Sequence, residues 1–388
     1  MSTAAAPAVA SSKAAIPARA FNFSAGPGVL PEPVLRQAQQ DLWSIMGSGI
    51  GIAEQSHRGT VFDKVLADAE AACRKVGNIP DNYKVLFLTG GATTQNHMVP
   101  ANLLPDDGVA AFLTTGVWTE KTWEEVGVYS SKCYEAWDGR ATNHSFCPAD
   151  NEVVYKDKPV YVHMCSNNTI YGTQFRNADG SIRLPHVPKG STLVCDASSD
   201  IFSRPINISD YGLIYCGAQK NVGIAGTTLV IIREDLLEPV RKLPTMLRYD
   251  SFAKNESRPN TPPVFPIYVS GLVFQWILDE GGLAVMHKRN MEKAKIIYDA
   301  LDASAFWAPH ARKDSRSLMN ITFKVNPKVA NAADLDKKFV KEALANGMDQ
   351  LKGHRSTGGM RASVYNAFPI EGCRALAQFM KDFEAKNG

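Results

Sequence analysis

The sequence lacks any long hydrophobic run and any strong excess of charge. No segment approaches the roughly 20 consecutive apolar residues that a membrane-spanning helix requires, and the formal net charge is only +3. A nearly balanced charge without a basic cluster gives no reason to expect a nucleic acid or an anionic membrane as a partner. With 388 residues, of which 45% are hydrophobic, the chain is long enough for two domains, and we expect a soluble protein.

The motifs by which nucleotides and metals are often bound are also missing. No G-x-G-x-x-G follows a predicted strand, because GSGIG at 47–51 has a different spacing, and there is no G-x-x-x-x-G-K-[ST] loop. The eight histidines form neither H-E-x-x-H nor another metal-ligand spacing. We therefore expect no bound metal, and any cofactor must be of another kind than a dinucleotide.

Paired cysteines and an acidic N-terminus are missing as well. The seven cysteines are odd in number and none forms C-x-x-C, which favours reduced, buried thiols in a cytosol-like compartment. Residues 1–20 contain no acid and are rich in Ala, Ser and Pro, which favours a disordered tail over the start of an organellar transit segment. We expect a cytoplasmic protein, with an organelle as the alternative.

Short apolar runs alternate with helical stretches from residue 83 onward. Several runs are apolar on both faces, as in strands buried between helix layers, and a helix is expected at 119–129. The predicted strands are 83–89, 109–114, 159–166, 192–198, 213–219 and 227–233. This order predicts an α/β domain with a mostly parallel sheet.

The last third of the chain has a different pattern. The proline-rich segment 258–268 is expected to be extended or a loop, and Gly281 and Gly282 predict a bend in a helical region at about 269–300. A smaller α+β domain is predicted from a strand, a helix, a strand pair and a helix at 315–325, 334–347, 350–367 and 371–386. We place the large domain at 37–281, and the small domain at 21–36 together with 282–388.

Three strand ends carry residues suited to one cofactor. LFLTGGATTQ at 86–95 leads from a strand through two glycines to a helix start, where free N–H groups suit a phosphate. Asp196 ends an apolar strand, where it either caps the next segment or faces a ligand. Lys220 follows another strand among small residues, where partial desolvation would lower its pKa. Pyridoxal 5'-phosphate needs a lysine, a carboxylate and an anion site, so the three features together favour this cofactor.

Longer motifs give the sequence a specific resemblance. FNFSAGPGVLP, SHR at 56–58, GGATTQ, TTGVW, CSNNTIYGTQF, DASSD, GAQKNVGIAG, NTPP and GHRSTGGMRASVYNA follow one another across residues 21–388. In this order they resemble the phosphoserine aminotransferase family, which belongs to the class V aminotransferases of pyridoxal-phosphate fold type I. The resemblance implies a large domain with a mostly parallel sheet, a smaller α+β C-terminal domain, and a homodimer with shared active sites.

The same resemblance implies which residues hold the cofactor. Lys220 would form the Schiff base and later carry a proton, and Asp196 would pair with the pyridine nitrogen. Trp118 would stack on the ring, although the indole by itself indicates only a core aromatic, and Thr169 would bind the phenolic oxygen. The phosphate would be held by Ala92, Thr93 and Gln219, joined by Asn260 and Thr261 from the second subunit.

The substrate residues follow from the resemblance and from charge. Arg361 resembles the family's clamp for the substrate α-carboxylate, which suits bidentate pairing with a guanidinium. His57 and Arg58, with His354 and Arg355 from the neighbouring subunit, would receive a distal phosphate or carboxylate. A lone arginine is usually a solvated surface charge, but two His–Arg pairs beside glycines are harder to explain in that way.

The resemblance implies a defined activity and leaves alternatives. L-Glutamate would transfer its amino group to 3-phosphohydroxypyruvate by a ping-pong course, giving O-phospho-L-serine and 2-oxoglutarate in serine biosynthesis. Some bacterial members also process a phosphorylated hydroxythreonine precursor, and the sequence leaves this second substrate open. A cysteine desulfurase-like lyase would need a reactive cysteine on a mobile loop. A non-catalytic scaffold would have no use for Lys220, Asp196 and Arg361.

Overall fold

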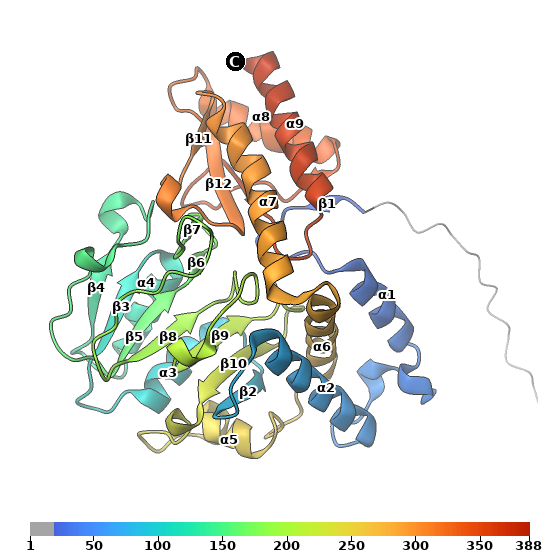
Figure 1. Ribbon diagram of the computed structural model, residues 1–388, viewed down its shortest axis with the longest axis vertical. Coiled ribbons are helices and arrows are strands. Elements are labelled where there is room, and N and C mark those ends of the chain that lie inside the picture. Colours follow the sequence, from blue (N-terminus) through green and yellow to red (C-terminus); the bar gives the residue numbers. More distant parts are fainter. Residues whose placement is uncertain (1–18) are drawn as a thin grey trace, which may run out of the picture.

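A seven-stranded sheet lies at the centre of the larger part of the chain (Figure 1). The computed structural model describes residues 19–388, so the predicted tail at 1–20 lies almost wholly outside the described residues. In spatial order the strands are β2 (Tyr83–Leu88), β10 (Thr228–Arg233), β9 (Leu213–Gly217), β8 (Thr192–Asp196), β5 (Tyr161–Cys165), β3 (Ala110–Thr114) and β4 (Tyr134–Asp138). β10 runs antiparallel to the other six strands, which are parallel to one another. The predicted mostly parallel sheet is therefore confirmed.

Both faces of this sheet are covered by helices. In β2, Val85 and Phe87 pack toward α2 (Thr60–Gly77) and α6 (Val264–Asp279). Leu86 and Leu88 point to the other face and pack with residues of α3 (Gln95–Leu103), α4 (Val117–Val126) and α5 (Tyr249–Lys254). Successive residues of a strand point to opposite faces, so a sheet covered on both sides requires continuous apolar runs. The sequence missed β4, an edge strand that carries Glu135 and Asp138.

The structure corrects the prediction for the proline-rich segment. α6 begins at Val264 and includes Pro266 in its first turn, so residues 264–268 are helical rather than extended. A proline is tolerated there because the first N–H groups of a helix have no intrahelical partner. The predicted bend is confirmed, since α6 and α7 (Gly282–Asp302) meet at 85°. Gly281 and Gly282 have φ of 103° and 77°, which favour glycine.

Among the described residues, no single helix has both the length and the apolar composition of a membrane span. Only α6 and α7 counted together, across their bend, meet those limits.

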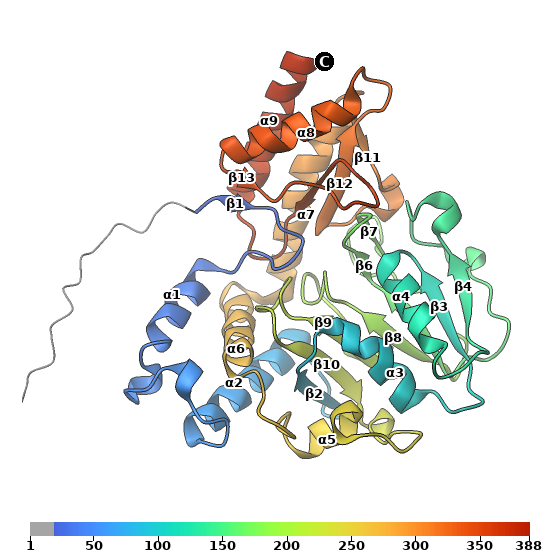
Figure 2. The ribbon, with the colours of Figure 1, turned by 180° about the vertical axis from the view of Figure 1, so that it is seen from behind.

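A second, smaller core lies above the large sheet in Figures 1 and 2. It packs around an antiparallel sheet of β11 (Trp307–Pro309), β12 (Asn320–Val325) and β14 (Met360–Ser363), with α7, α8 (Ala332–Ala345) and α9 (Ile370–Asn387). Phe23 joins this core, and β1 (Phe21–Asn22) pairs with β13 (Met348–Asp349). Residues from both ends of the chain thus share one core, and the exact domain limits stay a prediction.

Two predicted strands of this part are too long. The strand expected at 315–325 begins only at Asn320. In the strand pair expected at 350–367, residues 353–359 form a loop, and an isolated bridge joins Lys352 to Met360, the first residue of β14. Gly358 and Gly359 have φ of 65° and 58°, a left-handed conformation that ends regular pairing. This loop carries His354 and Arg355.

Candidate functional site

Lys220 and Asp196 lie at the carboxyl ends of adjacent parallel strands. Asp196 is the last residue of β8, and Lys220 follows the end of β9, which pairs with β8. The Nζ atom of Lys220 donates a hydrogen bond to Thr169 Oγ1 at 2.7 Å. Burial lowers the pKa of Lys220 and the charge of Arg361 lowers it further, while Asp196 acts in the opposite direction. A larger share of neutral amine at neutral pH suits both Schiff-base formation and proton transfer.

The carboxylate of Asp196 is buried and held from one side. Its Oδ1 atom accepts a hydrogen bond from Ser198 N at 2.9 Å, and Ser198 Oγ accepts one from Gly217 N. No hydrogen bond to Oδ2 is found within residues 19–388. Burial raises the pKa of Asp196, and the bonds from Ser198 and the charge of Lys220 oppose that shift. Asp196 therefore caps the next segment with one oxygen and leaves the other for a ligand.

Trp118, in the first turn of α4, presents an aromatic face to two amines. Lys220 Nζ lies 5.8 Å and Lys121 Nζ 5.1 Å from the centre of the indole ring. The Trp118 Nε1 atom is buried without a hydrogen-bond partner among the described residues, as are the hydroxyls of Thr115 and Thr119. Buried polar atoms usually have partners. This corner therefore fits a flat ligand that carries polar groups at its edge.

The expected phosphate corner lies at the start of α3. Gly91 has φ of 70° and precedes η3 (Ala92–Thr94), which leads into α3. The first N–H groups of such a helix have no intrahelical partners, and the positive end of its dipole favours an anion. Thr93 is exposed there and Ala92 is half-buried. η3 contacts β9, and the Gln219 side chain folds back over Gly217 at the end of that strand.

Arg361 lies on β14 of the smaller core and reaches the same site. Its NH1 atom is 3.4 Å from the carbonyl oxygen of Thr169, whose hydroxyl accepts the bond from Lys220. A cavity of about 780 Å³ is lined by Arg361, His354 and Arg355 together with α8 residues. Partial burial lowers the pKa of His354, and the charges of Arg361 and Arg355 add to the effect. Within one chain, the two arginines and His354, whose lowered pKa favours its neutral form, therefore face a common space.

The other predicted residues lie on the surface of the chain. Arg58, Asn260 and Thr261 are exposed, and His57 is half-buried. Arg58 Nε lies 3.3 Å from His57 Nε2, and the carbonyl oxygen of His57 accepts a hydrogen bond from Arg258. None of the four makes a hydrogen bond to Lys220 or Asp196 in the described part of the chain. Their predicted roles stay predictions.

Sequence reasoning assigned no role to several residues that support Lys220. Gly28 N donates to the carbonyl oxygen of Gln219 at 2.8 Å, and a Cβ atom on Gly28 would lie 2.6 Å from the carbonyl oxygen of Lys220. Asn366 N donates to Asn221 Oδ1 at 2.9 Å, which ties the end of β14 to the residue after Lys220. The glycines of the AGPG motif were the one signal that could have predicted such a close approach.

Comparisons with known proteins agree with this geometry. Residues 20–376 match the family model described as Aminotransferase class-V. A curated phosphoserine aminotransferase from Lysinibacillus sphaericus is 47% identical, over 95% of this chain and 99% of that protein. The chain belongs to the phosphoserine aminotransferase family of class V aminotransferases.

Solved members of the phosphoserine aminotransferase family have the same fold. The enzyme from Bacillus circulans subsp. alkalophilus is 43% identical, with a TM-score of 0.89 over 95% of this chain and 99% of that one. A phosphoserine aminotransferase from Trichomonas vaginalis, solved with pyridoxal phosphate bound, is 36% identical, with a TM-score of 0.87 over 94% of this chain and 100% of that one. The predicted family and fold class are therefore confirmed.

Proposed function

We propose that the protein transfers the amino group of L-glutamate to 3-phosphohydroxypyruvate and so forms O-phospho-L-serine for serine biosynthesis. Beyond membership of the family, the contacts of Thr169 are the main structural support for this proposal. Thr169 contacts Lys220 Nζ through its hydroxyl and Arg361 through its carbonyl oxygen. The amine that handles the substrate amino group and the guanidinium suited to its α-carboxylate therefore meet at one residue.

Pyridoxal 5'-phosphate is the cofactor that fits these residues. When bound, it supplies an electron sink for the carbon that carries the amino group. Trp118 offers its ring face, the start of α3 with Ala92, Thr93 and Gln219 offers donors for the phosphate, and Asp196 offers a carboxylate for the pyridine nitrogen. Within residues 19–388, Asp196 Oδ2 accepts no hydrogen bond and Trp118 Nε1 donates none, which supports this assignment.

The residues of the chain itself transfer the proton, position the amine and bind the substrate anions. Lys220 Nζ, with its lowered pKa, accepts a proton from the substrate Cα and donates it at a different carbon, a 1,3-proton shift that allows the amino group to be transferred. Thr169 holds Nζ in place by its hydrogen bond. Arg361 orients the α-carboxylate, while His57 and Arg58, together with His354 and Arg355 of the neighbouring subunit, receive a distal anion.

A homodimer with shared active sites is part of the proposal. Asn260 and Thr261 are exposed and form no hydrogen bond with Lys220 within residues 19–388, which supports a contribution to the site of a second subunit rather than to their own chain's site. Apolar side chains at 35–50 support a protein interface there, because Trp43 is 87% exposed and Met46 is 53% exposed.

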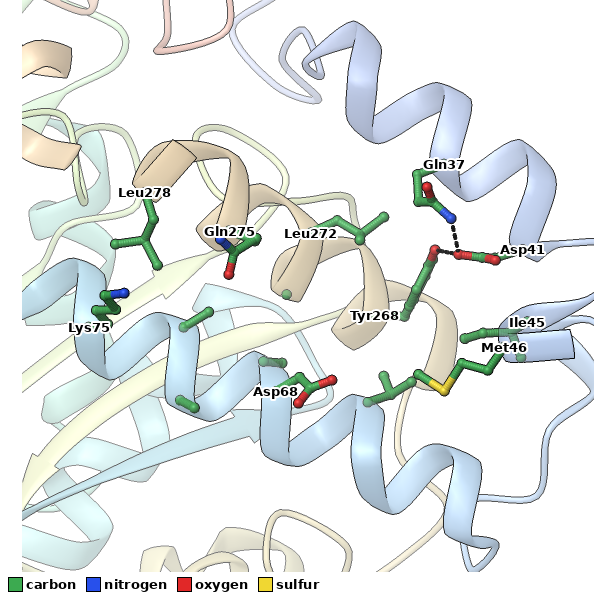
Figure 3. Close-up of a pocket in the computed structure, with 15 residues that line it drawn as sticks. Gln37, Asp41, Ile45, Met46, Asp68, Lys75, Tyr268, Leu272, Gln275 and Leu278 are labelled. Atoms are coloured by element: carbon green, nitrogen blue, oxygen red, sulfur yellow. Dashed lines mark hydrogen bonds between the residues drawn. The ribbon is translucent and has the colours of Figure 1, made fainter. Parts of the chain in front are cut away.

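A groove beside this apolar segment also supports an interface. A cavity of about 690 Å³ lies between α1 (Glu32–Asp41), α2 and α6, and Met46 lines it (Figure 3). Asp41 accepts hydrogen bonds from Gln37 and Tyr268 at one end of this groove. Most of the remaining lining is apolar, which suits burial against a second subunit more than exposure to water.

The desulfurase alternative is not favoured. Each of the seven cysteines is free, and burial raises the pKa of every thiol. A nucleophilic thiolate requires the opposite shift. We also propose a cytoplasmic location, as the reduced thiols led us to expect; a transit segment at residues 1–20 would instead imply an organelle.

The test is a coupled assay of the purified holoenzyme with L-glutamate. We expect 3-phosphohydroxypyruvate to be used at least about tenfold more efficiently than unphosphorylated hydroxypyruvate, because a charge-assisted pair contributes about 1.5–3 kcal/mol. Equal efficiency for the two oxo acids, or release of sulfide from cysteine at a comparable rate, would contradict the proposal.

A further inference from the structure

A second cationic cavity lies away from Lys220, at the seam between the two cores. Its volume is about 540 Å³, and it is lined by residues of three segments, 147–152, 176–183 and 312–315. The first two segments belong to the part of the chain that packs on the large sheet, and the third precedes β12. The β6–β7 hairpin (Asn167–Asn168 and Thr173–Gln174) lies beside β12 in Figure 1, and a bridge joins Thr173 to Arg316.

Basic residues outnumber acidic residues around this cavity. Arg176, Arg183, Arg312 and Lys313 line it, against only two acids, Glu152 and Asp314. Arg312 pairs with Asp314, and Lys313 pairs with Asp302, which also holds Arg316. Arg176 and Arg183 form no ion pair within the described residues. Glu152 forms no ion pair within the described residues either, but Asp302 is shared by Lys313 and Arg316, so five cationic side chains stand against three acids and the seam keeps an excess of two positive charges.

The two unpaired guanidinium groups are held in fixed positions by backbone oxygens. Arg183 donates to the carbonyl oxygens of Pro148 and Cys147, and its guanidinium lies 5.3 Å from the Phe175 ring centre. Arg176 donates to the carbonyl oxygens of Arg316, Asn177 and Lys313. A guanidinium has five N–H donors, so donors remain on both side chains.

The surroundings of Arg176 add to the attraction for an anion. Burial lowers the pKa of Arg176, and the neighbouring guanidinium groups of Arg204 and Arg316 lower it further. A bound anion would relieve this repulsion. Rigidly held guanidinium groups also lose little entropy when they bind an anion, because their rotamers are already fixed.

We propose that this cavity binds a small dianion of the phosphate type, which bridges Arg176 and Arg183 and so joins the two cores at their seam. The site is separate from the residues assigned to transamination, and the proposal does not depend on that function. Occupancy would stabilise the folded holoenzyme, because a ligand that binds only the folded state raises its stability.

The test measures binding of radiolabelled inorganic phosphate to the holoenzyme by equilibrium dialysis, at an ionic strength held constant with potassium chloride. The double variant Arg176→Gln/Arg183→Gln should lose one phosphate site per chain, or bind at that site at least tenfold more weakly. A variant with the same charge change, Arg36→Gln/Arg374→Gln, serves as the control, since both arginines are exposed on the surface. The wild type and both variants share any phosphate bound at the transamination site, so that contribution cancels when their binding is compared.

A variant that should have the opposite effect on phosphate affinity keeps the test decisive if the double variant does not fold. Asp314→Asn removes the acid that pairs with Arg312 and should tighten phosphate binding by severalfold. Phosphate should also raise the melting temperature of the wild-type holoenzyme more than that of the double variant. The proposal is overturned if a folded double variant binds phosphate as the wild type does, if the control loses the site equally, or if Asp314→Asn leaves the affinity unchanged.

Discussion

Two groups of residues in the candidate site differ in what holds them. The inner group, Lys220, Asp196, Thr169, Trp118 and Arg361, is buried or half-buried and lies among strand ends of its own chain. The outer group, Arg58, Asn260, Thr261 and Arg355, is exposed. A long exposed side chain loses considerable entropy when it is fixed in one rotamer, so a surface residue acts in a precise site only when another surface orders it. In the proposed homodimer, one chain would build the cofactor chemistry and a partner would complete substrate and phosphate recognition.

The largest effect is expected at the centre of the inner group. Lys220→Ala should lower transamination by at least about a thousandfold, because it removes the amine to which the proposal assigns the Schiff base. Borohydride reduction followed by peptide mass mapping should find the cofactor attached to residue 220 in the wild type and to no residue in the variant. Lys121→Ala is the matched control, since Lys121 lies over the same indole ring and should be dispensable for attachment. Attachment and turnover that survive in Lys220→Ala would refute the assignment.

A smaller loss is expected for the carboxylate. Asp196→Ala should keep the cofactor attached but slow turnover roughly a hundredfold, about 2.7 kcal/mol of barrier, because an unprotonated pyridine ring is a poor electron sink. Asp210→Ala, which removes an exposed carboxylate near the start of β9, is the control. We would abandon the role of Asp196 if single-turnover rates stayed within about threefold of the wild type.

The outer group is tested by subunit mixing. Arg355→Ala should reduce the preference for phosphorylated over unphosphorylated oxo acid by about tenfold to a hundredfold, since one charge-assisted contact contributes about 1.5–3 kcal/mol. Mixing this variant with inactive Lys220→Ala subunits creates one site that has both residues if Arg355 acts across the interface. The preference should then return. A mixture that exchanges subunits without regaining it would show that Arg355 acts in its own chain.

The smallest effect concerns the stability of the sheet that supports the inner group. Burial lowers the pKa of His163 on β5 to about 3, whereas an unfolded histidine has a pKa of about 6.5. Below pH 6.5 the unfolded chain binds a proton at this histidine that the folded chain does not. The free energy of unfolding therefore decreases as the pH is lowered, by at most about 1.4 kcal/mol per pH unit, down to about pH 3.

Urea denaturation between pH 7 and pH 5 checks this contribution. His163→Gln can keep the hydrogen bond to Tyr215 Oη but does not titrate, so its unfolding free energy should fall less steeply in acid. An exposed histidine, His186, provides the control as His186→Gln. Identical pH slopes for the wild type and His163→Gln would assign the acid sensitivity to other groups.

Local patterns picked out Lys220 and Asp196 as candidates because each lies at or just after the end of an apolar strand, whereas Trp118, Thr169 and Arg361 were named only from the family resemblance. The runs that end at Asp196 and just before Lys220 are buried on both faces, and parallel strands bring such ends to one edge of the sheet. The same reasoning failed for β4, whose acidic residues suit only a strand at the edge. It failed also at Val264, where α6 begins despite Pro266.

By itself, the sequence predicted the alternation of strands and helices, a candidate cofactor lysine with its carboxylate, and the family, because each of these is read from short motifs whose own residues are close together in the chain. Only the tertiary structure decided which distant segments meet. It placed Asn366 on Asn221, Gly28 against Lys220, and two unpaired arginines at a seam with residues 312–315. The physical reason is that packing between separate cores depends on side chains more than 100 residues apart, and no local spacing encodes that distance.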